Sequence, residues 1–165
     1  MKKLKVKKIT SIGNLKFIEH DSFETNQADK KLFSQFRKHK TFVAASTHNT
    51  EELFAAKTHI LLKKKIKNII TIIIPRHINR IDQIISQINE LGLNAISRRS
   101  NKKKLDNIDI YLVDTFGESK KFYKFATTVF LGGSIIKKGG QNPLEPARFL
   151  SLIHISETTR LHCIS

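Results

Sequence analysis

The sequence predicts an α/β domain built on a Rossmann-like parallel sheet, and three observations support this fold class. Short apolar runs alternate with amphipathic helical segments along the 165 residues, as expected for consecutive βαβ units. One run, Ile69 to Ile74, consists of β-branched residues throughout, which is typical of a strand covered on both faces. Polar or glycine-rich segments follow four of the runs, and ligands bind at that edge of such sheets.

The elements follow from local periodicity. Residues 27–39 are expected to form a helix with its apolar side chains on one face, and residues 41–45 a buried strand that leads to a helix beginning near Thr50. After the strand at 69–74, isoleucines at helical spacing predict a helix over 81–91, ended by Gly92. The remaining expected elements are strands at 4–9, 94–97, 108–113 and 127–131, a helix at 118–126, and a helix that begins near Asn142-Pro143.

The chain is strongly basic, with 30 Lys and Arg against 14 Asp and Glu and a net charge of +16. Nucleic acid and an anionic membrane surface are the partners that such a charge favours. The lysine clusters lack interleaved aromatic residues, so a nucleic-acid stacking platform is not expected. A lysine-rich, AT-rich coding sequence explains the charge equally well.

The cysteine content and the hydropathy of the sequence exclude further classes of protein. The single cysteine, Cys163, cannot form an internal disulfide framework or a cysteine metal cluster. The longest apolar run is Ile69 to Ile74, far shorter than the roughly 20 residues that cross a bilayer. The basic N-terminus has no apolar segment behind it, so a signal peptide is not expected.

Residues 132–147 indicate a phosphate or sugar site. Four glycines, Ser134, Asn142 and Glu145 lie in this segment, directly behind the expected strand at 127–131. A strand that opens into a glycine-rich loop and a helix start is a common way to bind a nucleotide. Glu145 is either a partner of the helix dipole or an acceptor for ribose hydroxyls.

Cations follow the strand at 69–74. Arg76, His77 and Arg80 lie at the strand end and in the following first turn, where the helix dipole disfavours positive charge. Their placement therefore indicates that an anion binds there. Glu51 and Glu52 open another helix, and capping explains them adequately.

Other polar residues give weaker signals. His48 follows Ser46 and Thr47, but nothing indicates a catalytic triad, and solvent-facing polar residues are the simpler interpretation. Asp114 is a candidate helix cap. The seven histidines have no metal-ligand spacing, so no metal site is expected.

Taken in order, these motifs resemble the C-terminal half of the 3-deoxy-D-manno-octulosonate (Kdo) transferases. The resemblance runs from about residue 11 to 149. The matching segments are residues 13–17 (GNLKF), 44–48 (AASTH) with Glu51 and Glu52, 75–77 (PRH) with Arg80, Arg99 and Ser100, 114–118 (DTFGE), 132–134 (GGS) and 139–147 (GGQNPLEPA).

The resemblance implies a GT-B glycosyltransferase that moves Kdo from CMP-Kdo to a lipid A precursor, inverting the anomeric centre, on the cytoplasmic face of the inner membrane. This chain would be its C-terminal donor-binding domain, without a metal or other cofactor, and no nucleic-acid partner is implied. The site residues implied are Arg76 and His77 for phosphate or sugar carboxylate, Phe116 and Gly117 for cytosine, Glu118 beside them, Gly133 and Ser134 at the donor border, Asn142 and Glu145 for ribose, and Ser46, Glu51 and Glu52 along the cleft.

The sequence departs from the family at several places. Thr50 and Gln141 stand where Gly and His are expected, and Phe116 stands where Met is usual. The domain is expected over 1–150 and incomplete, and 151–165 does not match the family. The N-terminal domain and its general base are missing, so the chain alone is expected to be inactive. A basic nucleic-acid-binding module and a GT-B donor domain for another nucleotide sugar remain the alternatives.

Overall fold

The computed structural model describes residues 27–100, 104–136, 141–149 and 152–154. These residues form a six-stranded sheet in the order β3-β4-β2-β1-β5-β6, and every neighbouring pair is parallel. The strands are β1 (Lys40–Thr47), β2 (Ile69–Pro75), β3 (Ala95–Ser97), β4 (Ile110–Leu112), β5 (Thr128–Leu131) and β6 (Leu152–His154). The helices are α1 (Gln27–Phe36), α2 (Glu51–Lys63), the short 3₁₀ helix η2 (Ile78–Arg80), α3 (Ile81–Glu90), α4 (Ser119–Tyr123) and α5 (Leu144–Ala147). The α/β Rossmann-like fold class is confirmed.

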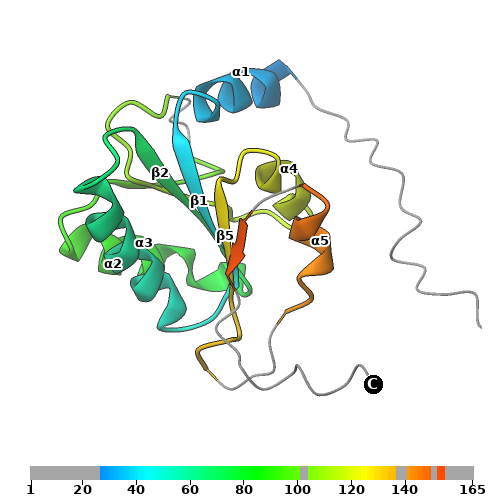
Figure 1. Ribbon diagram of the computed structural model, residues 1–165. Helices are drawn as coiled ribbons and strands as arrows, with labels where there is room; N and C mark the ends of the chain where they lie inside the picture. Colours follow the sequence, from blue (N-terminus) through cyan, green and yellow to red (C-terminus); the bar gives the residue numbers. More distant parts are fainter. Residues whose placement is uncertain (1–26, 101–103, 137–140, 150–151, 155–165) are drawn as a thin grey trace, which may run out of the picture.

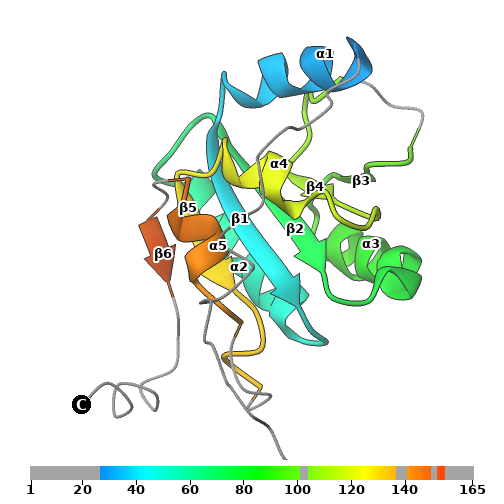
Figure 2. The ribbon, with the colours of Figure 1, turned by 90° about the vertical axis from the view of Figure 1, so that its right-hand side faces the viewer.

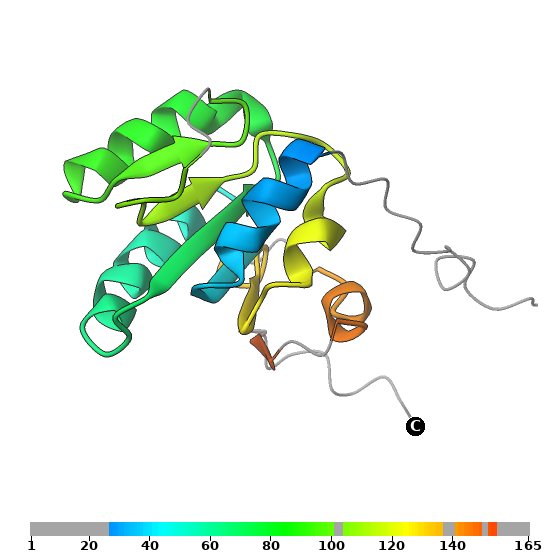
Figure 3. The same cartoon turned by 90° about the horizontal axis from the view of Figure 1, so that it is seen from above.

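Helices cover both faces of the sheet (Figures 1 and 3). Helices α1 and α4 pack on one face in a cluster that includes Phe36 and Phe122, and α2 and α3 pack on the other in a cluster that includes Ala56 and Ile84. Successive residues of β2 alternate between the two clusters, Ile72 with the first and Ile73 with the second. The continuous apolar run at 69–74 follows from this two-sided burial.

The sheet has a topological switch point at β1. From β1 the chain crosses through α2 to β2 on one side, whereas α4 leads from β4 to β5 on the other side of β1. In open parallel sheets, the strands on either side of such a point leave a crevice at their carboxyl ends, where ligands bind. The fold therefore places the expected site beside the ends of β1 and β5, an edge seen in Figure 2.

Two expected helices are shorter than periodicity predicts. The helix expected over 27–39 ends at Phe36, and the one expected over 118–126 is α4, which ends at Tyr123. After α4, Phe125 N–H donates to the Phe122 carbonyl and Ala126 N–H to the Tyr123 carbonyl. These tight turns redirect the chain into β5, so the connection ends the helix before its apolar pattern does.

A sixth strand lies in a segment where no strand was expected. Leu152–His154 pairs in parallel with Thr128–Phe130 of β5, inside the 151–165 stretch that does not match the family pattern. The strand expected at 4–9 and the GNLKF segment at 13–17 lie outside the described residues. The division of the chain at residue 150 stays a prediction.

Candidate functional site

The loops after β1 and β5 meet at the carboxyl edge and leave no space for a side chain at Gly132. A Cβ there would lie 2.4 Å from the Ser46 carbonyl oxygen and 2.7 Å from the Thr47 Cα. The Gly132 N–H also donates to the Ala45 carbonyl over 2.8 Å. Ser46 itself has a φ of 54° and lies at the register shift of β1. Glycine is therefore required at 132 by close backbone approach.

Glu51 ties these two loops together. Its fully buried carboxylate accepts hydrogen bonds from the backbone N–H groups of Gly133 at 2.9 Å, Ile135 at 3.2 Å and His48 at 2.9 Å. One carboxylate thus orients the loop after β5 against the start of α2. Helix capping was the expectation from the residues alone, but the donors come mainly from a segment more than 80 positions away.

Glu52 is paired with Arg80, one of the cations that the sequence analysis expected to bind an external anion. Arg80 donates to the Glu52 carboxylate from Nη1 at 3.2 Å and to Asn49 Oδ1 from Nη2 at 2.8 Å. Burial raises the pKa of Glu52, and the Arg80 charge opposes that rise. The argument that Arg80 needs an external anion is therefore wrong, because its charge is balanced within the domain.

Arg76 and His77 remain exposed at the end of β2. The Arg76 N–H donates to the Thr47 carbonyl at 2.8 Å, which joins this segment to β1. The His77 ring lies 5.9 Å from the His48 ring, edge to face. Within the described residues, the Arg76 guanidinium has no acidic partner, so this side of the edge presents an unbalanced cation.

The loop after β4 presents an aromatic ring next to a closed ion-pair network. Phe116 is 77% exposed, and Gly117 turns the chain with a φ of 74°. Glu118 accepts hydrogen bonds from Arg98, Thr115 and Lys121. Although burial raises the pKa of Glu118, these bonds lower it to about 2, so the carboxylate is ionised and occupied by side chains of the domain.

Asp29 belongs to the same network and was not predicted from the sequence. It is 2% exposed and is hydrogen-bonded to Arg98 and, at 3.2 Å, to Lys121. Burial opposes the charge of Arg98, but the hydrogen bonds that Arg98 donates to Glu118 and Asp29 raise its pKa overall. The sequence shows an acidic residue in the first turn of α1, but that position does not indicate that Asp29 pairs with Arg98.

The segment after β5 carries the remaining expected site residues. Gly133 has a φ of 79°, and the buried Ser134 hydroxyl donates to the Leu131 carbonyl. Asn142 is exposed, and Glu145 in α5 lies 4.0 Å from the Lys120 ammonium. Gly139 and Gly140 lie outside the described residues.

The edge thus brings some expected residues together and separates others. Glu51 contacts Gly133, and His77 lies beside His48. Arg76 and Phe116 follow β2 and β4 and are exposed, and Glu145 lies in α5, close to Lys120 of α4. Among the described residues, no group of three or more His, Cys, Asp or Glu could hold a metal ion. The donor roles of these residues stay predictions.

A Rossmann-like parallel sheet that carries glycines and an exposed arginine at its carboxyl edge is typical of a nucleotide-binding class of domain. No family model matches the sequence. Curated relatives do match: the 3-deoxy-D-manno-octulosonic acid transferase of Haemophilus influenzae is 31% identical over 143 residues, and that of Rickettsia felis is 36% identical over 144. These alignments cover 86% and 87% of this chain but 34% and 31% of the relatives. The chain belongs to the Kdo transferase family and spans about a third of the length of these relatives.

A solved structure identifies which part of the family the chain matches. It is the C-terminal CMP-Kdo binding domain of WaaA from Acinetobacter baumannii, with a TM-score of 0.69 and 26% sequence identity. The match covers 77% of this chain and 67% of that one. Across the residues that the structure describes, none of the helices combines the length and apolar composition needed to span a bilayer.

Proposed function

We propose that this chain is the donor-binding part of a Kdo transferase and that CMP-Kdo binds at the carboxyl edge of β1, β2, β4 and β5. The observation that carries the proposal is the structural match to a CMP-Kdo binding domain. It is supported by the four polar strand-end segments, which the parallel registers bring to one edge.

The proposed contacts follow the chemistry at that edge. Arg76, exposed and without an acidic partner in the described residues, and His77 hold the phosphate or the sugar carboxylate. The exposed ring of Phe116 and the neighbouring Gly117 receive the cytosine. Gly133 and Ser134 border the donor, and Asn142 and Glu145 accept the ribose.

The whole enzyme transfers Kdo to a lipid A precursor on the cytoplasmic face of the inner membrane, with inversion and with no cofactor besides the donor. Such a transfer needs a base that deprotonates the acceptor hydroxyl and cations that stabilise the departing CMP. In this proposal, Arg76 at the edge of this domain is a cation that stabilises the departing CMP, and the base comes from the other domain of the enzyme.

Calorimetric titration of CMP into the chain tests the proposal. We expect Arg76→Ala to weaken binding by about tenfold or more, because a hydrogen-bonded charge pair contributes roughly 1.5–3 kcal/mol. Glu145→Ala should also weaken it, through the lost ribose contact. Arg148→Ala, which removes another exposed arginine just after α5, is the control and should leave affinity unchanged.

Two results would contradict the proposal. Equal CMP affinity in the unaltered chain, Arg76→Ala and Glu145→Ala would place the nucleotide elsewhere. Displacement of CMP by an equal concentration of UDP would indicate a domain for another nucleotide sugar, since a cytosine pocket discriminates by hydrogen bonds to the base.

A further inference from the structure

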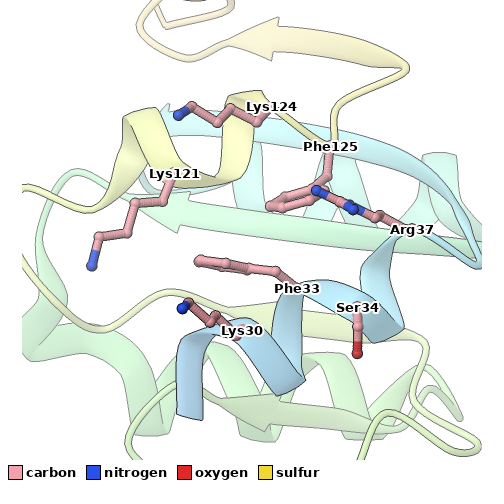
Figure 4. A pocket seen from close by; sticks show the side chains of 7 residues that line it. All are labelled: Lys30, Phe33, Ser34, Arg37, Lys121, Lys124 and Phe125. Carbon is pink, nitrogen blue, oxygen red and sulfur yellow. The ribbon is translucent and has the colours of Figure 1, made fainter. Parts of the chain in front are cut away.

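A second cleft lies between α1 and α4, on one face of the sheet (Figure 4). It encloses about 320 Å³, within the range of sites for small ligands. Its lining residues are Lys30, Phe33 and Ser34 of α1, Arg37 just after α1, Lys121 of α4, and Lys124 and Phe125 just after α4. None of these seven belongs to the proposed donor site.

The lining carries four cations and no acidic residue. Lys121 is already balanced, because its ammonium lies 2.9 Å from Glu118 and 3.2 Å from Asp29. Lys30 and Arg37 are exposed and pair with no acid in the described part of the chain. Uncompensated cations around a concavity attract an anion, so the cleft selects negatively charged ligands.

The middle of the cleft is apolar. The rings of Phe33 and Phe125 lie 5.0 Å apart at an angle of 31°, and Figure 4 shows them between the surrounding cationic side chains. The Lys124 ammonium lies 5.9 Å from the ring of Phe149, which extends this mixed surface toward α5. A ligand that fits both parts carries an anionic group next to an apolar body.

The positive surface continues beyond the rim of the cleft. Lys31 in α1 and Lys38 just after it are exposed, as is Arg148 at the end of α5. A flat anionic surface can contact such residues while one of its headgroups enters the cleft. The cleft is too short for a strand of nucleic acid, whose binding needs a groove with several stacking positions.

We propose that the α1–α4 cleft binds the phosphate of an anionic phospholipid headgroup and holds this face of the domain against a membrane. The inference rests on the proposed function in one respect, which is that transfer to a lipid acceptor takes place at a membrane. The rim cations Lys30 and Arg37 contact the phosphate, and the two phenylalanines contact the glycerol and the first methylene groups.

Co-sedimentation with phosphatidylcholine vesicles, with and without phosphatidylglycerol, tests the proposal. We expect the chain to bind only the vesicles that contain phosphatidylglycerol. The Lys30→Gln/Arg37→Gln double variant should bind them about tenfold or more weakly. The matched control is Lys64→Gln/Lys65→Gln, which removes the same charge from exposed positions after α2 and should change binding much less.

Thermal unfolding of both variants, followed by circular dichroism, checks that they fold like the unaltered chain. Equal losses in the two double variants would show a general charge effect and would overturn the cleft assignment. Retention on single-stranded DNA that the cleft variant abolishes would assign the cleft to another ligand. The unaltered chain is also titrated with CMP. If it binds the vesicles but not CMP, the proposed function alone is contradicted. If it binds CMP but not the vesicles, this proposal alone is contradicted.

Discussion

Thr50 precedes α2 with a φ of 79°, a left-handed conformation that strains a β-branched residue. The family resemblance places glycine here, and the backbone supplies the physical reason for it. The side chain of Thr50 makes no capping hydrogen bond that offsets the strain.

Thr50→Gly should therefore raise the free energy of unfolding by about 1 kcal/mol, the net of relieved strain and greater freedom in the unfolded chain. Urea denaturation measures the change. Thr50→Ala retains a Cβ and is the control, for which we expect only a small part of the gain. A Thr50→Gly chain less stable than the unaltered one would contradict the assigned strain.

Glu51 provides a second test at the residue scale. Glu51→Gln replaces one acceptor oxygen with an NH₂ group that faces the backbone N–H donors of Gly133, Ile135 or His48. An unsatisfied buried donor should lower the free energy of unfolding by about 1–3 kcal/mol. Thermal unfolding measures this, and CMP affinity should fall with it because the loop after β5 loses its anchor. Unchanged stability would show that the loop is held by other contacts.

His59 makes stability depend on pH. The buried ring accepts from the Thr71 hydroxyl at Nδ1 and donates to Asp109 from Nε2. Burial lowers the pKa of His59 from 6.5, although Asp109 opposes the shift. The unfolded chain therefore takes up a proton before the folded one as the pH falls.

The contribution of His59 is thus fully present above pH 6.5 and is lost below it, as the pH approaches the lowered folded pKa. Denaturation midpoints between pH 7.5 and 5 (from about one unit above to about one and a half units below an ordinary histidine pKa) should show the decline. In His59→Gln, the part of the slope that is due to this ring should disappear. An unchanged slope would contradict the assignment.

At the scale of elements, the packing of α1 and α4 depends on a few long-range contacts. Phe36 is fully buried and meets the ring of Tyr111 at 5.2 Å and that of Phe122 at 6.0 Å. Arg98 joins Asp29 of α1 to Glu118, the residue before α4. The α1–α4 cleft exists only while these contacts hold the two helices at this separation.

Arg98→Ala should lower the free energy of unfolding near pH 7 by about 3–5 kcal/mol, because it leaves Asp29 and Glu118 as inadequately paired buried charges. The pKa of Glu118 is lowered to about 2 from 4.5, so its stabilisation is present above pH 4.5 and is lost as the pH falls toward 2. The difference in free energy of unfolding between the variant and the unaltered chain, measured by chemical denaturation, should become smaller over that pH range. Arg99→Ala, at the exposed neighbouring position, is the control and should have little effect.

At the scale of the whole molecule, one region of the described surface is strongly apolar. A groove of about 690 Å³ runs between α2 and the start of β5, with Phe54, Leu62 and Phe130 in its lining. Phe54 is 46% exposed, and its ring lies 5.5 Å from that of Phe130. Exposed apolar patches of this kind favour self-association.

We therefore expect concentration-dependent association in sedimentation velocity experiments, and Phe54→Ser should reduce it. Phe116→Ser removes a more exposed phenylalanine, 77% accessible, from the carboxyl edge and should leave association unchanged. Equal reduction by both variants would show that association does not depend on the groove.

Much of the architecture could be predicted because its signals are local. The isoleucine run at 69–74 predicts a buried strand, whose side chains alternate between the two faces of the sheet. The isoleucines that begin at Ile81 recur about every 3.6 residues and predict a helix with one buried face. The lengths of the helices were less predictable. Helix α4 is an example, because the turn at Phe125 that follows it depends on the position of β5. The partner of Arg80 was missed because Glu52 lies 28 residues away on another helix.

Between residues 27 and 149, the sequence by itself determined the alternation of strands and helices, the parallel sheet, the family, and the segments that reach the carboxyl edge. Only the tertiary structure decided that Glu51 anchors the loop at Gly133, 82 residues later, and that Arg98 pairs with Asp29, 69 residues earlier. The physical reason is that periodicity reports which face of an element is buried, whereas these pairings depend on the packing between elements. The placement of β5 beside β1, and of α4 beside α1, brings those groups within hydrogen-bond distance.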